Sequence, residues 1–336
     1  MDKVIKRTTG VEIMNIEIGL NEAGQRLDKF LRKLLKDVPL STIFKALRKG
    51  DIRVNGKKQK EKYSLVEGDI VTIKYIQTNA KKEITKTFQK VDSSKIKIVY
   101  EDENMLLVEK WPGVLVHADR KDGDPTLNDY VLSHLFKKGD YTPENEITFT
   151  PAPCNRLDRN TSGIVFFGKN FESLKALNEM IRERRVKKYY CALVKGRMKD
   201  GRYEAFITKD EGNNKSEVFY DNKPNTKKIA MDVKVLESDG LFSLLEIELI
   251  TGRSHQLRAH LAFLGHPIVG DYKYGDRKLN SFFENKFGLT YQFLYAYKVI
   301  FKEVPEKFGY LKNKTIAQAL PPIFKKIKKD VFKVRF

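Results

Sequence analysis

The sequence predicts an α+β protein: a small α/β domain followed by a larger domain on a mixed, largely antiparallel β-sheet with flanking helices. Two segments with helical apolar spacing precede a short hairpin pattern within the first 76 residues. From residue 93 onward, strand-like runs outnumber helical ones and short turns join them, which is typical of antiparallel sheets. The chain has no glycine-rich phosphate loop in a strand–turn–helix context, which argues against a doubly wound nucleotide fold.

The composition favours a cytoplasmic protein with a polyanionic partner. Of 336 residues, 41% are hydrophobic, and the net charge is +20. No apolar run approaches the roughly 20 residues that span a bilayer, and the charged N-terminus lacks the apolar segment of a signal peptide. Cys154 and Cys191 are far apart, which fits a reduced compartment. The charge favours nucleic acid first and an anionic membrane second; a lysine-rich proteome is the alternative explanation.

The chain divides into five expected segments. They are an N-terminal extension (1–17), a small domain (18–76), a linker (77–92), a large domain (93–310) and a basic C-terminal tail (311–336). Residues 1–100 carry 23 Lys and Arg against 12 Asp and Glu, which indicates a separate basic module near the N-terminus. We interpret the tail either as an arm that contacts nucleic acid or as a solvated terminal segment.

The small domain is expected to hold two helices and a hairpin. Leu27, Phe30, Leu31, Leu34 and Leu35 have helical spacing. A second helix is expected to begin at an N-cap serine, residue 41, and to end at a C-cap glycine, residue 50. Strand-like stretches at 51–60 and 66–76, each with a glycine-containing turn, complete the domain.

The stretches GQRLDKFL, LSTIFKALRKGDIRVNGKK and LVEGDIVTI resemble the S4-type RNA-binding domain, which is named after a small-subunit ribosomal protein. In that family, the second helix and the loop after it face RNA. The resemblance therefore implies RNA contacts by the polar and basic side chains of this surface: Ser41, Lys45, Arg48, Lys49, Arg53, Asn55, Lys57 and Lys58. The alternative is an ordinary solvated helix face, which the three helix cations alone would fit.

The large domain is expected to contain helices at 126–138, 171–185 and 254–265. A hairpin is expected at 235–252, where Ser-Asp-Gly supplies the turn. A buried strand is expected at 163–167, directly after the loop NRLDRNTSG. Functional side chains often lie on such a loop, because the strand gives it a rigid support.

That loop places Asp158 between Arg156 and Arg159. A neighbouring guanidinium favours the ionised carboxylate, and a partly desolvated carboxylate can act as a nucleophile or a base. The alternative is a structural aspartate that pairs with Arg156 or caps a turn. Taken by itself, this loop favours the structural alternative.

Two further stretches bear on Asp158. RVKKYYCALVKG predicts a strand whose adjacent tyrosines, Tyr189 and Tyr190, point to opposite faces, and core packing explains one of them. TGRSHQLRAHLAFLGHP holds His255, His260 and His266. Their spacing does not match a helical zinc pair and no cysteine lies nearby, so we expect no metal site.

Together these stretches resemble the pseudouridine synthase family that acts on large-subunit ribosomal RNA and some transfer RNA. The family's R-L-D-x-x-T-S-G loop matches residues 156–163, and its K-x-Y-x-A-x-V-x-G strand matches 188–196. T-G-R-x-H-Q-L-R-x-H matches 251–260, and G-H-P-x-x-G-D-x-x-Y-G follows at 265–275. L-L-V-x-K-x-x-G-x-x-V-H opens the series at 106–117. The resemblance covers about residues 95–305 and implies the family's fold and a cofactor-free, metal-free conversion of uridine to pseudouridine in structured RNA.

The resemblance also implies roles for single residues. Asp158 would attack the ribose anomeric carbon or carbon 6 of the uracil, which then detaches, rotates and reattaches through carbon 5. Arg253 would pair with Asp158. Tyr190 would stack on the uracil and take part in removing the proton from carbon 5. Arg156 would fill the gap left by the flipped nucleotide, because a uridine inside a helix must be extruded to be reached. We place two further residues, Asn155 and His117, on the RNA.

Two departures and two other functions stay open. Asn155 stands where many members have His, and Trp111 separates Lys110 from the proline that often follows it directly. We expect altered RNA contacts and a reshaped loop rather than a loss of activity. A non-catalytic RNA-binding or ribosome-assembly factor of the same fold would not need Asp158. A two-carboxylate hydrolase would need a second acid, for which the distant Asp271 is the candidate. We expect a monomer that binds RNA.

Overall fold

The structure, a computed structural model, describes residues 7–8, 11–76, 88, 90–118, 123–210, 212 and 215–333. Two sheets organise them, one of four strands and one of eleven. Within the described strands, β14 and β8 form the parallel pair of the larger sheet, and its other pairs are antiparallel. The predicted α+β class is therefore confirmed. No helix within these ranges has both the length and the apolar character needed to cross a bilayer.

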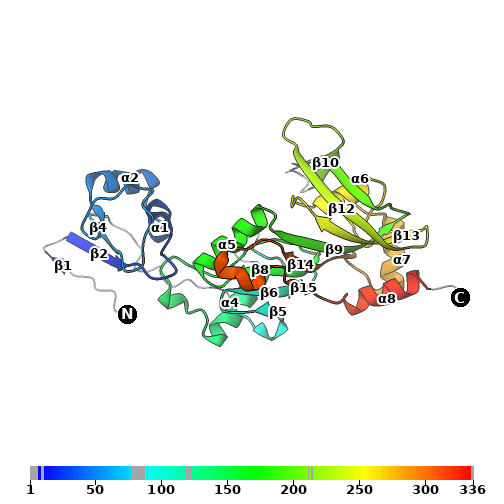
Figure 1. The fold of residues 1–336 in the computed structure, drawn as a ribbon, viewed down its shortest axis with the longest axis horizontal. Helices are drawn as coiled ribbons and strands as arrows, with labels where there is room; N and C mark the ends of the chain where they lie inside the picture. The colour runs from blue at the N-terminus through cyan, green and yellow to red at the C-terminus, as the bar shows by residue number, and fades with distance from the viewer. Residues whose placement is uncertain are drawn as a thin grey trace.

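The first module contains the smaller sheet and two helices (Figure 1). Its elements are β1 (Arg7–Thr8), β2 (Val11–Glu17), α1 (Leu27–Leu34), α2 (Leu40–Lys49), β3 (Ile52–Val54) and β4 (Ile70–Lys74). The apolar face predicted for α1 is confirmed, since Leu27, Phe30 and Leu31 are completely buried. Gly50 ends α2 with φ 83°, a left-handed conformation that favours glycine.

Three expectations about segment ends are affected by the structure. The N-cap of α2 is Pro39 rather than Ser41, because Pro39 holds the extended ψ of 140° that precedes a helix and Leu40 already lies in the first turn. β2 lies in the segment that we expected to be an extension, yet it pairs with β4 over Ile13–Glu17 and completes the small sheet. Most of the expected linker, 77–87 and residue 89, lies outside the described residues.

The large sheet runs in the order β11-β10-β12-β13-β9-β14-β8-β6-β5. The remaining elements are η1 (Ser93–Lys95), β5 (Lys97–Glu101), β6 (Met105–Lys110), α4 (Leu127–Lys138), η2 (Pro143–Asn145), β7 (Ala152–Pro153), β8 (Ser162–Gly168), α5 (Phe171–Arg182), β9 (Val186–Lys195), β10 (Gly201–Asp210), β11 (Lys215–Phe219), β12 (Lys227–Ser238), β13 (Phe242–Leu249), α6 (Gln256–Phe263), α7 (Arg277–Phe287), β14 (Leu294–Phe301), η3 (Glu306–Leu311), β15 (Thr315–Ala317) and α8 (Pro322–Val331).

Helices cover both faces of this sheet. Successive side chains of a strand point to opposite faces, and the central strands have apolar side chains on both. On β8, Val165 and Phe167 pack in the same cluster as α4, whereas Ile164 and Phe166 pack with the α5 residue Leu177. Further along, α6 shares the α4 side of the sheet, and α7 and α8 pack on the opposite face of β9. The α6 side is where the candidate site lies.

The segment expected to be a tail is largely folded onto the large domain. β15 pairs with β14, and Phe324 of α8 stacks on Phe293 with ring centroids 3.8 Å apart. Lys328 on the same helix forms an ion pair with Glu237 at the end of β12. A boundary at residue 310 therefore does not mark the end of the folded unit.

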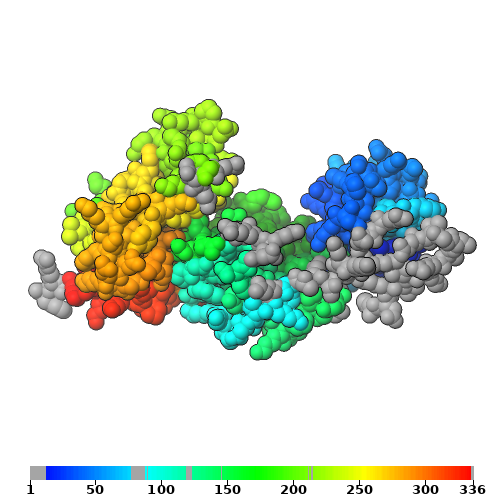
Figure 2. All heavy atoms as spheres, turned by 180° about the vertical axis from the view of Figure 1, so that it is seen from behind, coloured from blue at the N-terminus to red at the C-terminus, as the bar shows by residue number. Residues whose placement is uncertain are grey.

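The first module docks on the large domain through polar contacts, and Figure 2 shows it as a lobe at one end of the molecule. Glu22, which is 3% exposed, accepts hydrogen bonds from the Thr148 backbone N–H at 2.9 Å and its hydroxyl at 3.3 Å. Gln25 donates to the same hydroxyl at 3.1 Å. Asn21 donates to Glu146 and accepts from the backbone N–H of Phe171. These contacts fix the module's orientation relative to α5 and to the segment that precedes β7.

Candidate active site

The loop that carries Asp158 is anchored where it enters β8. Gly163 has φ 126°, and its neighbour across the parallel pair is Ala296 of β14. A Cβ at this position would lie 2.3 Å from the Ala296 carbonyl oxygen, so glycine is required. Asn155 holds the other end of the loop, since its side-chain oxygen accepts the Phe166 backbone N–H at 2.9 Å.

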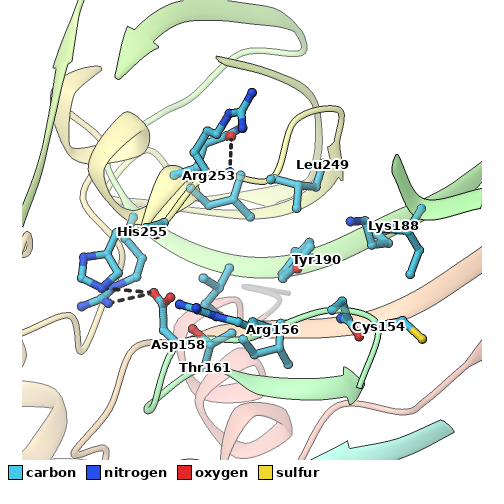
Figure 3. Close-up of a pocket in the computed structure, with 18 residues that line it drawn as sticks. Cys154, Arg156, Asp158, Thr161, Lys188, Tyr190, Leu249, Arg253 and His255 are labelled. Carbon is cyan, nitrogen blue, oxygen red and sulfur yellow. Dashed lines mark hydrogen bonds and ion pairs between the residues drawn. The ribbon is translucent and has the colours of Figure 1, made fainter. Parts of the chain in front are cut away.

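Asp158 is bound by an arginine that lies 100 residues away in the sequence (Figure 3). The Arg258 Nη1 donates to Oδ2 of Asp158 at 2.9 Å. The same guanidinium donates through Nε and Nη2 to both carboxylate oxygens of Asp271, at 2.7 and 3.0 Å. One side chain of α6 thus bridges two carboxylates, and the planar, forked guanidinium is suited to this geometry.

The two carboxylates have different surroundings. The Asp271 side chain is completely buried and also accepts the backbone N–H groups of Lys273 and Tyr274. The Asp158 side chain is 25% exposed. Burial alone would lower the pKa of Arg258, but its bonds to Asp271 and the charge of Asp158 raise that pKa above its ordinary value. The fixed cation therefore holds Asp158 in place, while Asp158 keeps one side open to a ligand.

Two aromatic side chains complete the surroundings of this cation. The Tyr274 ring centroid lies 5.2 Å from the Arg258 guanidinium carbon, within cation–π range. The Tyr274 hydroxyl contacts Nδ1 of His255 at 2.9 Å, and the opposite nitrogen of His255 lies 4.0 Å from Asp158. A set of packed contacts thus limits the motion of the Arg258–Asp158 pair.

The predicted ion pair between Arg253 and Asp158 is wrong. Arg253 lies in the turn before α6, where its backbone N–H donates to the side chain of Gln256, and its own side chain is exposed. Gln256 further ties this turn to β12 through the Ala230 carbonyl. Arg258 lies on the buried face of α6 and reaches Asp158 from there, which the distance along the sequence did not reveal.

Asp158 and Arg156 lie at the boundary of two hollows. A pocket of about 470 Å³ is lined by both residues together with Tyr190 and the apolar side chains of Leu249 and Leu294. A larger cleft of about 1010 Å³ is also lined by both, on the side of His117. Basic side chains dominate the cleft: Arg156, Arg159, Lys209, Lys215, Arg258, Lys273 and Arg277.

Tyr190 forms part of the pocket wall and is 6% exposed. Burial and, secondarily, the charge of Asp158 raise its pKa above the ordinary value. The neutral phenol is therefore favoured, which suits a stacking surface better than a base in the resting site. Its neighbour Tyr189 points to the other face, where its hydroxyl donates to Glu248. The predicted division of the two tyrosines between the faces is thus present.

Lys110 supports the Asp158 loop, although no role was expected for it. Its side chain is completely buried, and its ammonium group donates to the carbonyls of Arg159 at 2.7 Å, Val114 at 2.9 Å and Trp111 at 3.1 Å. Burial lowers the pKa of Lys110 to about 7, and the nearby Asp158 opposes this effect. Three acceptors match the three N–H donors of a charged lysine.

The three histidines that suggested a metal occupy separate environments. His255 contacts Tyr274, and Nδ1 of His266 contacts the Lys195 carbonyl at 3.0 Å. His260 is completely buried, and neither of its ring nitrogens has a hydrogen-bond partner in the described part of the chain. Within those same residues, no group of three or more His, Cys, Asp or Glu side chains is arranged as metal ligands would be.

The residues expected to contact RNA divide into two groups. Arg156 and His117 are exposed and line the cleft, whereas the amide of Asn155 is engaged by the β8 backbone and acts on the loop instead. On the first module, the expected surface is exposed at every position: Ser41, Lys45, Arg48, Lys49, Arg53, Asn55, Lys57 and Lys58. Arg53 also donates to the Gly50 and Gly56 carbonyls, so it braces the turn as well.

Arg258 and Asp271 were missed as a functional pair. A usable signal was present, because Arg258 lies between Leu257 and Leu261 on the apolar face of the predicted helix. A cation on a buried face requires a carboxylate partner. The second acid near Asp158 is therefore Asp271, which binds the same guanidinium. Its carboxylate oxygens already accept hydrogen bonds from Arg258 and from two backbone amides.

Comparisons with known proteins show which families the chain is similar to. Residues 104–263 match the RNA pseudouridylate synthase family, and residues 25–71 match the S4 domain. Ribosomal large subunit pseudouridine synthase C of Vibrio parahaemolyticus is 34% identical over 87% of this chain and 89% of its own length. The protein of that name from Escherichia coli is 34% identical over 86% of this chain and 89% of its length.

A solved structure shares the fold. Human RNA pseudouridylate synthase domain containing 4 has a TM-score of 0.55 and 24% identity, covering 70% of this chain and 92% of the human one. The match to the synthase family spans Asp158, Tyr190 and Arg258, and the match to the S4 domain lies within the first module. The chain belongs to the pseudouridine synthase family.

Proposed function

We propose that this chain converts uridine to pseudouridine at defined sites of structured RNA, and that large-subunit ribosomal RNA is the substrate. The observation that carries the proposal is the position of Asp158. Its carboxylate is held by Arg258 at the boundary between a pocket with a tyrosine wall and a wide basic cleft. A flipped uridine fits the first hollow and the flanking RNA strand fits the second.

In the proposed reaction, Asp158 is the catalytic carboxylate. Its oxygen forms a bond to the anomeric carbon of the ribose or to carbon 6 of the uracil, and the C1′–N1 bond breaks. After the base has rotated, a C1′–C5 bond forms and the bond to Asp158 breaks, which regenerates the carboxylate. The proton on C5 leaves and N1 gains one, so atoms and charge balance without a cofactor. The guanidinium of Arg258 fixes the position of the carboxylate, and the apolar side chains of Leu249 and Leu294 line the pocket that it faces.

Tyr190 stacks on the uracil in this proposal, and its hydroxyl takes part in removing the proton from carbon 5 once the base has moved. Arg156 lies at the rim shared by the pocket and the cleft, which suits a planar side chain that replaces the extruded nucleotide. The names of the bacterial relatives support ribosomal RNA of the large subunit as the substrate, and the S4 domain supports an RNA partner. A cytoplasmic location follows from this substrate.

Modification mapping tests the proposal. In a deletion strain, wild-type protein is expected to restore specific pseudouridines in ribosomal RNA, and Asp158→Asn is expected to restore none. Asp124→Asn, which changes an exposed carboxylate outside both hollows, is the matched control and is expected to act like wild type. A non-catalytic assembly factor would instead give identical pseudouridine maps with and without the chain.

A further inference from the structure

A groove of about 330 Å³ continues the candidate pocket beyond Tyr190. It lies between the end of α5, the start of β9 and residues 248–253, and we call it the basic groove. Ile181, Lys188, Leu249, Gly252 and Arg253 line both the pocket and the groove, so the two hollows are continuous. In the view of Figure 3, Tyr190 lies between Asp158 and Lys188.

The basic groove carries an excess of positive charge. Its cations are Arg182, Arg184, Lys187, Lys188 and Arg253, and Glu248 is its carboxylate. Glu248 already has two partners, because it forms an ion pair with Lys187 at 2.9 Å and accepts a hydrogen bond from the Tyr189 hydroxyl. Arg182 lies 3.6 Å from Glu183 at the surface. A polyanion that enters the groove would therefore meet more cations than the groove's own carboxylate can pair with.

Three of these cations have no carboxylate within ion-pair distance among the described residues: Arg184, Lys188 and Arg253. Lys188 lies at the junction of pocket and groove, where burial lowers its pKa. A desolvated cation without a partner is unfavourable in the empty protein. An anionic ligand at this junction would remove that cost.

Arg184 breaks a local rule of helix termination. It follows the C-cap of α5 with φ 62°, and the Arg185 N–H donates to the Met180 carbonyl at 2.8 Å, as in a Schellman motif. Glycine is the favoured residue at such a position, because a Cβ disfavours positive φ. An arginine here is less suited to the fold than glycine, and local rules are broken most often where function requires it.

We propose that the basic groove binds the phosphodiester backbone of the RNA strand next to the flipped uridine. Arg253 and Arg184 contact phosphates along the groove, and Lys188 contacts the phosphate at its junction with the pocket. Arg253 is therefore an RNA-binding residue rather than the partner of Asp158. This inference rests on the proposed function, since it takes the pocket to be the uridine site.

The test is the salt dependence of RNA binding, measured in an Asp158→Asn background with a transcript of large-subunit ribosomal RNA. Removing one phosphate contact lowers the slope of log K against log salt by about 0.7 to 1. We expect Arg253→Gln and Arg184→Gly each to lower it by this amount, and their combination to lower it by about twice as much. Arg197→Gln is the matched control, because Arg197 is exposed at the opposite end of β9 and lines none of the hollows described above.

Arg184→Gly separates binding from folding. We expect its melting temperature to equal or exceed that of the parent protein, because glycine relieves the left-handed backbone, while RNA binding weakens. An unchanged slope in the double variant, or an equal decrease in Arg197→Gln, would overturn the inference. Failure of the proposed function gives a different result: wild-type protein then makes no pseudouridine, whatever the groove variants do to the slope.

Discussion

The two regions expected to meet RNA treat their charges in opposite ways. On the S4 domain, Lys45, Arg48 and Lys49 are exposed on one helix and have no ion-pair partner within the described ranges. At the candidate active site, Arg258 is 8% exposed and bridges Asp158 and Asp271. Exposed cations can each bind a phosphate independently, so mutating one leaves the others in place. In the buried bridge, the position of each carboxylate depends on the same guanidinium. The first region is suited to affinity, and the second to positioning.

Breaking the buried bridge is expected to have the largest effect. Arg258→Met leaves Asp271 as a completely buried carboxylate without its cation, which costs about 3–5 kcal/mol of unfolding free energy. It also frees Asp158, so we expect the single-turnover rate to fall at least about a hundredfold. Urea unfolding and rapid-quench kinetics measure the two effects. Arg258→Met combined with Asp271→Leu should recover stability but not rate, and recovery of both would contradict the positioning role.

Lys110 extends the comparison to a buried cation that is held by backbone carbonyls. Lys110→Met removes the donors to the Arg159 carbonyl of the Asp158 loop and to the Trp111 and Val114 carbonyls of the neighbouring segment, at a cost of roughly 1–3 kcal/mol. We expect a lower melting temperature and a slower reaction, because the Asp158 loop loses the ammonium group that binds the Arg159 carbonyl. That carbonyl then accepts a hydrogen bond from the Gly113 N–H alone. Calorimetry compared with Lys95→Met, a change at an exposed lysine of η1, checks this. Equal melting temperatures for the two variants would show that the three bonds do not support the loop.

Acid should destabilise the large domain through His260. Burial lowers the pKa of His260 from 6.5 to about 4. Between these values the unfolded chain binds a proton that the folded chain does not, so stability falls as the pH falls through this window. The contribution is about 2 kcal/mol between pH 7 and 5. His260→Leu should flatten this part of the stability profile in denaturant titrations, and an unaltered profile would rule out His260 as its source.

Changes on the S4 surface should have the smallest effect on the fold. We expect the triple variant Lys45→Gln, Arg48→Gln, Lys49→Gln to alter unfolding free energy by less than about 0.5 kcal/mol. RNA binding should weaken, and its salt slope should decrease by about 1 for each phosphate that is no longer bound. Filter binding over a salt series measures this. A slope equal to that of wild type would assign the three cations to an ordinary solvated face.

The same contrast explains what the sequence could predict. The exposed face of α2 follows from helical spacing alone, so its cations were correctly identified as surface residues. The loop 155–163 and strands β8 and β9 follow from local patterns too. The Arg258–Asp158 contact joins segments 100 residues apart, so no local pattern could name Asp158 as the partner, although the leucines around Arg258 mark it as the buried arginine of its motif. The position at which α6 begins determines which arginine reaches Asp158. Arg253 lies in the turn before the helix, and Arg258 lies on the buried face of the helix.

Two elements were not predicted from the sequence. A strand signal was present for β2, because Met14, Ile16 and Ile18 alternate with Asn15 and Glu17, and the pairing with β4 then places this strand in the small sheet. The helix α8 resembles a basic tail because lysines are prominent in its sequence. Phe324 and Ile327 suffice to bury one face of it against the core. Long-range partners therefore place both segments in the fold: β4 for β2, and the core around Phe293 for α8.

The most direct test of the central claim separates binding from chemistry at Asp158. The Asp158→Asn variant and wild-type protein are each mixed in excess with a ribosomal RNA fragment, and both bound RNA and pseudouridine are measured over one turnover. We predict that the variant binds the RNA within about threefold of wild type, a difference below about 1 kcal/mol, and forms no pseudouridine. Pseudouridine formed at the wild-type rate, or a decrease in binding large enough to explain the missing product, would contradict the assignment of Asp158 as the reacting carboxylate.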